Sequence, residues 1–428
     1  FYRRVVGLSA FEYFGKRFGR AVRSYSSLAF AAGHFSKMGF VIYLLALTVS
    51  QVTGWRVSTM VIALGAVTVV YTLIGGLEAV MWSDVLQGFL LAVGVFVAVG
   101  YLLFSPQSQP VAMLHMIAAH HKTSLGSFKL NLHEPTFWVL ALYGVFFYLQ
   151  KYTADQTVVQ RYLAARTDRE ALLGTGMGAL LCVPVWAAFM FIGSLLWAFY
   201  HLPGNHAPTG MSTPDQIFPH FLMTQMPPVA SGVFLAALFG AAMSMLASDM
   251  NCLALILVED HYRMFFPGST DKQRLRMGRI MVVCCGALAV GVSLLLRDAH
   301  GGVLKVYYAV TAVVAGGLAG LFLLAFLMRR AGRKAALSAI GISMAFTIYA
   351  TLTLDNGKFL NLHGWNYPWH ADTIGAVGSI LLFVVGVVFA MIFPEPQGSG
   401  ASLTLWQWLE DRRASAFKTE VSISGSRR

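Results

Sequence analysis

Apolar residues gather along this chain into runs that are long enough to cross a lipid bilayer, separated by shorter polar segments. A membrane core needs about 20 apolar residues in a helix, because only a helix satisfies its own backbone hydrogen bonds there. The pattern predicts an all-α integral membrane protein with a multi-span domain over 1–394. About ten runs fit, at 25–51, 57–75, 79–104, 136–160, 172–200, 228–258, 277–296, 303–328, 335–354 and 373–393.

Composition agrees with this pattern and excludes two other classes of protein. Hydrophobic residues make up 57% of the chain and charged residues only 12%. That balance is far from a soluble enzyme, whose charged share is about 25%. It is equally far from a disordered chain, because 13% of the residues are aromatic and supply ample apolar surface.

The net charge of +12 reports membrane orientation rather than nucleic-acid binding. Basic residues gather in alternate connecting segments, beginning with the N-terminal segment, and are sparse in the others. Cytoplasmic loops carry such an excess, so we expect both termini in the cytoplasm of a cell-membrane protein. The segment 395–428 is polar and is expected to form a cytoplasmic tail. Basic residues on the expected inner side include Arg17, Arg161, Arg169, Arg274, Arg330 and Arg413.

Two connecting segments carry further features. The segment 8–20 predicts a short amphipathic helix at the inner surface, and 214–226 predicts a similar one at the outer side. The outer segment 105–135 contains four histidines, which are either solvated side chains or ligands of a metal ion. These histidines are His115, His120, His121 and His133.

Charged residues inside the spans are the candidates for function, since a charge at the centre of a bilayer is costly. Asp84 begins the third span, where it either caps a helix or faces a binding site. Lys151 and Asp155 are four residues apart in the fourth span, a spacing that allows an ion pair. That pair either serves neutralisation alone or belongs to a polar, broken helix that lines a site with Gln156.

The sixth span combines small and polar residues. Alanine and glycine at 236–242 permit close helix contact, and Ser244 and Ser248 continue on one face as a polar stripe with Asn251. Asp249 lies just off that stripe. Lys37 in the first span is either buried or extends toward the membrane surface.

Several separate blocks of this sequence resemble the sodium–solute symporters, the family of sodium–glucose, sodium–proline and sodium–sialic acid transporters. They occur in the family's order over residues 8–335. The blocks are 11–19, 71–76 with 82–87, 155–165, 215–221, 236–262 and 322–330. The resemblance implies an inverted-repeat fold of five plus five helices, including broken helices. It also implies that the fold is incomplete at the N-terminus, where two or three spans and the first broken helix would precede this chain.

The resemblance also assigns residues. It places a coupling cation at the backbone carbonyl of Ala241 and the hydroxyl of Ser244. It also assigns Asp84 to cation binding, near the exit route, where the matching residue contributes to a second sodium site in some members. Met245 stands where the family usually has a hydroxyl residue, and a thioether is a poor ligand for a hard cation. The substrate is expected near Asp155, Gln156 and Lys151, and the latter would favour a carboxylate if Asp155 left it unneutralised. Residues expected to modulate the site are Met245, Ser248 and Asp249.

The function implied is secondary active transport by alternating access. Sodium, with a proton as the alternative ion, drives uptake of a small polar organic solute such as a sugar, sialic acid, amino acid or carboxylate. The partners expected are that solute and the bilayer, with no nucleic acid, no cofactor and no metal besides the coupling cation. An enzyme is not expected, because no metal or Ser/His motif recurs within the spans. The rival hypothesis is a transporter-like sensor or scaffold that does not transport.

Overall fold

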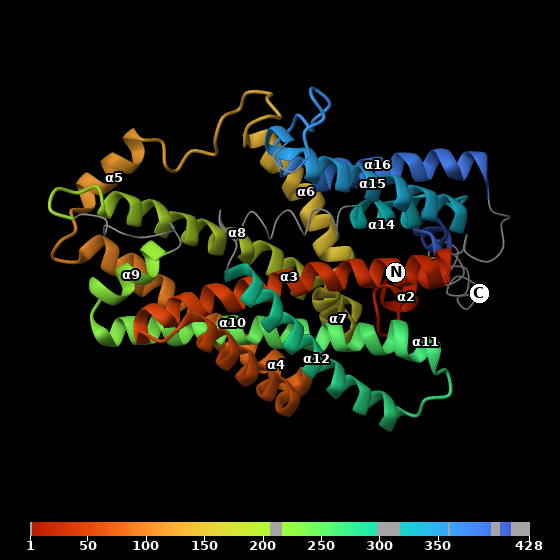
Figure 1. Ribbon diagram of the computed structural model, residues 1–428, viewed down its shortest axis with the longest axis horizontal. Helices are drawn as coiled ribbons and strands as arrows, with labels where there is room; N and C mark the ends of the chain where they lie inside the picture. The colour runs from red at the N-terminus through yellow and green to blue at the C-terminus, as the bar shows by residue number, and fades with distance from the viewer. Residues whose placement is uncertain (1, 206–215, 298–316, 358–359, 395–402, 412–428) are drawn as a thin grey trace, which may run out of the picture.

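The computed structural model describes residues 2–205, 216–297, 317–357, 360–394 and 403–411. Within these ranges every regular element is a helix, and most of the long helices run roughly along the long axis of the molecule (Figure 1). Eight helical segments are long and apolar enough to cross a membrane. They are Arg20–Gln51, Val57–Gly75, Val80–Phe104, Asp168–Phe199, Pro228–Phe265, Asp271–Leu296, Arg333–Leu354 and Thr373–Ile392.

The helices follow one another with short connections. The first half holds α1 (Tyr2–Val5), α2 (Glu12–Phe18), α3 (Arg20–Thr53), α4 (Val57–Phe104), α5 (Pro110–Ala119), α6 (Phe137–Thr153), α7 (Gln156–Ala164) and α8 (Asp168–Phe199). The second half holds α9 (Ile217–Thr224), α10 (Pro228–Ile256), the π-helical turn η2 (Leu257–Tyr262), α11 (Arg263–Phe265), α12 (Asp271–Arg297), α14 (Leu318–Leu327), α15 (Arg333–Gly357) and α16 (Thr373–Ile392).

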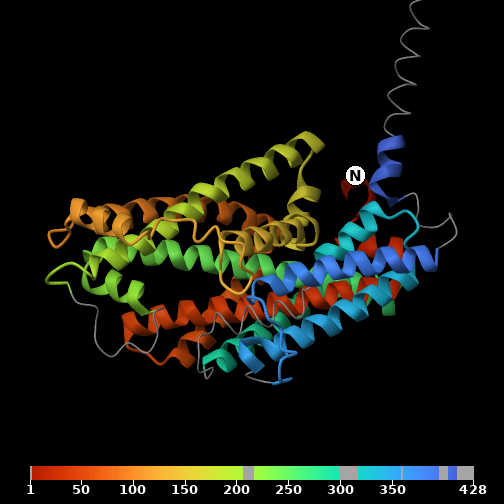
Figure 2. The same cartoon turned by 90° about the horizontal axis from the view of Figure 1, so that it is seen from above.

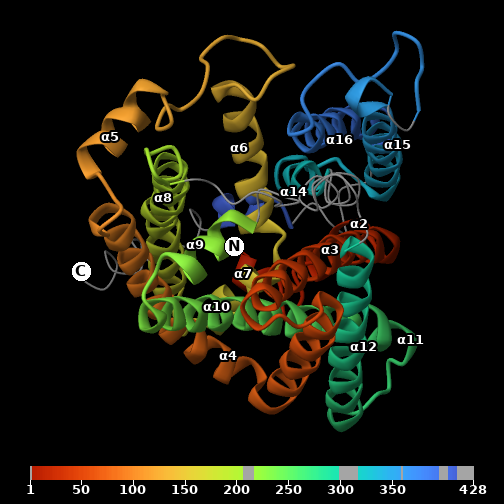
Figure 3. The same ribbon diagram turned by 60° about the vertical axis from the view of Figure 1, so that its left-hand side comes forward.

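Four predicted spans differ from simple membrane helices. The second and third predicted spans belong to one helix, α4, which bends so that its two halves run in different directions (Figure 3). The fourth, 136–160, consists of two helices, α6 and α7, separated at Ala154 and Asp155. The eighth, 303–328, falls largely outside the described residues, which include only its final part as α14.

The helix expected at 8–20 exists as α2, but it packs inside the protein rather than lying on the membrane surface. Tyr13 and Phe14 are fully buried, and the Phe14 ring lies 4.4 Å from that of Phe322 on α14. The apolar face of α2 therefore covers α14 instead of lipid. Gly19 has φ +90°, a conformation that favours glycine, and it lets α3 begin directly after α2.

Helices α14, α15 and α16 lie together at one end of the molecule, as two views show (Figures 1 and 2). A Cβ atom at Gly320 would collide with the carbonyl oxygen of Ser379 on α16. Glycine at this position permits the close approach of the two helices, in keeping with a packing role for the small residues of this span.

Buried polar contacts fix the end of α10. Asp260 in η2 is 1% exposed and accepts hydrogen bonds from Arg23 of α3, at 2.8 Å to Nε, and from Ser9, at 2.7 Å. The π-helical turn is thus tied to α3 and to the segment before α2. This arrangement holds α10 in a defined position relative to α3.

Candidate functional site

Asp155 explains why the fourth predicted span is broken. Its carboxylate accepts hydrogen bonds from the backbone N–H of Thr157 at 2.9 Å and from the Thr157 hydroxyl at 2.6 Å. This is the geometry of an N-cap, so Asp155 starts α7 where α6 has ended. Lys151, in the last turn of α6, reaches across the break with Nζ 2.8 Å from the same carboxylate. The ion pair that the spacing allowed is present, and the helix is broken, which was one of the two alternatives that the sequence left open.

A second group of charges joins α3 to α10. Asp249 is 1% exposed, and Nζ of Lys37 lies 2.8 Å from its carboxylate. His34 places Nδ1 3.0 Å from Asp249 and Nε2 3.9 Å from Asp155. Lys37 is therefore directed into the protein. Asp249, which lies just off the serine stripe of α10, is its ion-pair partner.

Asp84 lies inside α4 and does not cap a helix, so the capping interpretation is wrong. The reason is that α4 continues through the segment expected to be a loop, which leaves Asp84 far from a helix start. Its carboxylate instead accepts a hydrogen bond from Arg161 of α7 at 2.6 Å. The Asp84 side chain is 26% exposed and that of Arg161 is 49% exposed, so the pair is open to solvent.

The polar stripe of α10 faces the same space. Ser244 is 3% exposed, and its hydroxyl has no hydrogen-bond partner among the described residues. Met245, beside it, is 37% exposed. Gln87 of α4, one turn after Asp84, approaches α10 at Gly240, where its side chain lies 3.0 Å from the position a Cβ atom would occupy.

These side chains enclose a polar cavity of about 430 Å³. Most of the predicted site residues line it, together with several that the sequence did not single out. The lining residues are Lys37, Asp84, Gln87, Gly88, Lys151, Thr157, Arg161, Ala241, Ser244, Met245, Ser248 and Asp249. Three basic side chains belong to this lining, and each forms an ion pair with an aspartate.

Gln156 and Asp155 do not line the polar cavity. Gln156 is fully buried, with its side-chain oxygen 2.6 Å from the backbone N of Ala10 and its Nε2 2.6 Å from the carbonyl oxygen of Leu8. Its amide therefore binds the N-terminal segment to α7. Asp155 contacts the cavity lining through Thr157 and through Lys151, whose charge it neutralises.

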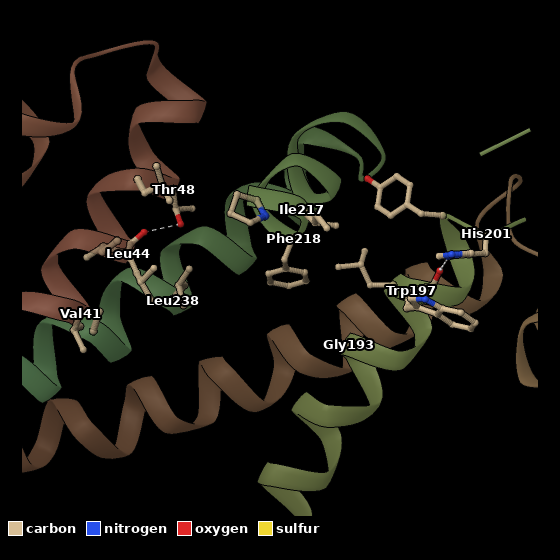
Figure 4. A pocket seen from close by; sticks show the side chains of 15 residues that line it. Val41, Leu44, Thr48, Gly193, Trp197, His201, Ile217, Phe218 and Leu238 are labelled. Carbon is tan, nitrogen blue, oxygen red and sulfur yellow. Dashed lines mark hydrogen bonds between the residues drawn. The ribbon is translucent and has the colours of Figure 1, made fainter. Parts of the chain in front are cut away.

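A second, apolar cavity of about 600 Å³ lies farther along the same two helices, α3 and α10 (Figure 4). Val41, Leu44 and Thr48 of α3 line one side, and another is lined by Gly193 and Trp197 of α8 with His201 just after that helix. Phe218 of α9 projects between them. The two cavities meet along α10, because Ala241 faces the polar cavity and the next residue, Ala242, faces the apolar one.

The sequence did not identify the partners that complete the polar cavity. Arg161 stood out only as an inner-side basic residue within a family block, and His34, which contacts the buried Asp249, was not singled out. Their contacts join residues that are far apart in the chain, such as Asp84 with Arg161, so no local spacing reveals them.

The histidines of 105–135 lie on α5 or in the segment after it, and all four are described. Nowhere in the described part of the chain do three or more His, Cys, Asp or Glu side chains gather as a metal site would require. Of the cysteines, Cys252 and Cys285 are buried whereas Cys284 is exposed.

Known proteins resemble this chain along nearly its whole length. The Sodium:solute symporter family model matches residues 2–342. The sodium/sialic acid symporter NanT of Aliivibrio fischeri is 28% identical over 422 residues, 98% of this chain and 80% of that protein. The sodium-dependent multivitamin transporter of Oryctolagus cuniculus is 31% identical over 348 residues, 79% of this chain and 54% of that protein.

A solved structure shares the fold. It is described as a substrate-bound outward-open state of a Na⁺-coupled sialic acid symporter with a novel Na⁺ site. Its TM-score is 0.78 at 25% identity, covering 93% of this chain and 80% of that one. Together with the family match, this likeness establishes the transporter fold and excludes an enzyme. The chain belongs to the sodium:solute symporter family and is a multi-pass membrane protein that couples solute uptake to sodium.

Proposed function

We propose that the transported solute is a small organic acid and that it meets the coupling sodium ion in the polar cavity. The observation that carries the proposal is the cavity lining, in which Lys37, Lys151 and Arg161 stand beside the polar face of α10. The names of relatives point the same way, since they include sialic acid symporters and a monocarboxylate transporter. A carboxylate is the natural partner of such basic side chains.

The cation site of the proposal uses oxygen atoms of α10. Na⁺ is a hard cation and favours oxygen ligands, and the buried Ser244 hydroxyl is without a protein partner among the described residues. The Ala241 carbonyl is the second ligand, one helical turn earlier. Met245 supplies no oxygen, so the ion is held by fewer hydroxyls than in a site with serine there. Asp84 is partly exposed to solvent and binds the sodium ion on its route through the protein. The ion then takes the place of Arg161 as the partner of the Asp84 carboxylate.

The remaining site residues act in different ways. Lys151 contacts the solute from the end of α6, with Asp155 holding both the lysine and the start of α7. Gln156 supports the site from behind, through its bonds to Leu8 and Ala10. The solute, rather than any cofactor, is the small-molecule partner.

The driving force comes from the membrane. With both termini of the chain in the cytoplasm, sodium moves inward down its gradient, and one charge crossing about 100 mV releases ~2.3 kcal/mol. Sodium binding stabilises the state that captures the solute, which is then released inside by alternating access.

Proteoliposomes containing the full chain test this function. Uptake of radiolabelled lactate, sialic acid and glucose is measured with an inward sodium gradient, with an inward proton gradient alone, and with neither. We expect sodium-driven uptake of an acid and little uptake of glucose. Uptake of glucose but of no acid overturns the substrate class, and acid uptake driven by protons without sodium overturns the coupling ion.

A further inference from the structure

Five ionisable side chains form an unbroken series through the centre of the protein. Lys37 pairs with Asp249 at 2.8 Å, Asp249 contacts His34 at 3.0 Å, His34 faces Asp155 at 3.9 Å, and Asp155 pairs with Lys151 at 2.8 Å. Lys37, Asp249 and Lys151 of this series line the polar cavity, and its three middle members, Asp249, His34 and Asp155, are buried. The series connects α3, α10 and the junction of α6 with α7.

The charges of the series balance only when the imidazole is neutral. Two lysines and two aspartates then sum to zero, and a proton on His34 leaves one positive charge in excess. A membrane interior disfavours such an excess unless an anion neutralises it. The protonated series therefore matches one carboxylate in the cavity.

His34 is placed to take up that proton. A neutral imidazole that donates from Nδ1 to Asp249 keeps its lone pair on Nε2, which faces Asp155. The proton from water binds Nε2 and makes the ring a cation between two carboxylates. Among the described residues, His34 faces these two aspartates and Lys37 of its own helix; Lys151 and the Cys252 thiol lie next to the aspartates. The Phe30 ring covers His34 at 3.9 Å.

Protonation of His34 also changes which positive charges compensate the Asp249 carboxylate. With neutral His34, the buried Asp249 carboxylate depends on the Lys37 ammonium for its counter-charge. With cationic His34 it has a second counter-charge, so Lys37, whose side chain is already 18% exposed, is able to turn into the cavity. Lys37 then offers its ammonium group to an anion without leaving a buried charge unpaired.

We propose that His34, Asp249 and Lys37 form a proton-controlled anion site, in which a proton bound by His34 releases Lys37 to bind the carboxylate of the solute. This inference rests on the proposed function for its class of solute. It assigns to Asp249, His34 and Lys37 roles in recognising the acid, separate from the sodium ligands of α10.

Calorimetry of the full chain in lipid nanodiscs tests the site without transport. Lactate and sialic acid are titrated at saturating sodium in two buffers of different ionisation enthalpy, which report the protons taken up on binding. We expect uptake of about one proton per acid bound, and an affinity that is higher at low pH than at high pH.

Three variants give distinct results. His34→Gln is expected to bind the acid weakly at every pH with no proton uptake. Asp249→Asn removes the charge that holds Lys37, so it should bind at high pH as tightly as the unmodified chain does at low pH, a gain that misfolding cannot produce. The matched control is His115→Gln, an exposed histidine of α5, which should behave as the unmodified chain.

The possible results separate the two proposals. Acid binding without proton uptake, or unchanged proton uptake in His34→Gln, overturns the proton-controlled site and leaves the organic-acid function standing. Absence of binding by both acids at every pH overturns the organic-acid class, and the anion site with it.

Discussion

The two cavities share α3 and α10 as walls but differ in the physical forces that hold their linings together. The polar cavity holds Lys37, Asp84, Asp249 and their partners, and its ion pairs depend on one another. The apolar cavity is lined by aliphatic and aromatic side chains, such as Leu44 and Phe218, each packed independently (Figure 4). A change in the first should spread to several groups, whereas a change in the second should stay local. The contrast shows that charges are retained in the membrane here only as a mutually compensating set.

The largest effect expected is the loss of stability in Lys37→Met. It leaves the buried Asp249 carboxylate without its ammonium partner, and breaking such a pair costs about 3 to 5 kcal/mol. Lowering the pH should restore part of this loss, because a protonated His34 then compensates Asp249. Thermal unfolding of the purified protein in detergent measures both effects.

A matched change in the apolar cavity serves as the control. Leu44→Met, on the same helix, conserves volume and should cost less than about 1.5 kcal/mol, with no dependence on pH. Equal losses for the two variants would remove the distinction between the cavities.

Asp84→Asn should have the next largest effect, on sodium affinity. Losing an ionised ligand costs about 1.5 to 3 kcal/mol, so the sodium concentration for half-maximal uptake should rise about ten- to a hundredfold. Arg161→Gln removes the competing partner of Asp84 and should shift this concentration downward. Uptake at graded sodium concentrations measures both variants, and unchanged sodium dependence in Asp84→Asn refutes its assignment.

Met245→Ser should strengthen sodium binding, by a smaller amount. An added hydroxyl next to Ser244 contributes about 0.5 to 1.5 kcal/mol, which lowers the half-saturating sodium concentration about two- to tenfold. Met243→Ser is the control, because that methionine lines neither cavity. A similar gain in both variants would show that general polarity, and not an ion ligand, is responsible.

The smallest effect is expected from Thr48→Val in the apolar cavity. The Thr48 hydroxyl donates to the carbonyl oxygen of Leu44 at 3.0 Å, and the cavity around it is lined mainly by apolar side chains, which supply few further oxygen ligands for sodium. Sodium dependence of uptake should change less than about twofold. A larger change would mean that the apolar cavity takes part in cation binding.

Hydropathy alone predicted much of the fold. The expected span 57–75 ends at the residue where the apolar segment Val57–Gly75 ends, and 373–393 lies within one residue of α16. Such agreement follows from the bilayer, which requires apolar side chains over a fixed length. The break at Asp155 was harder to predict. An aspartate that caps a helix and an aspartate that lines a pore can stand in the same local sequence, four residues after a lysine.

The site could be predicted only in part. Ser244, Met245 and Ser248 recur on one face of one helix, so their common location followed from the 3.6-residue period. The partners Asp84 with Arg161 and Asp249 with Lys37 join different helices, and helix packing alone decides them. Gln156, assigned to the substrate by resemblance, is bonded to backbone at both ends of its amide.

Those two bonds of Gln156 join α7 to the segment that leads into α2. If α7 tilts during a transport cycle, residues 8–10 must tilt with it as one rigid body. The side chain of Leu8 is 51% exposed, so it offers an attachment point outside the polar cavity. A fluorescent or spin label at Leu8, introduced as cysteine with the exposed Cys284 replaced, would therefore serve as a remote reporter of the α6–α7 junction.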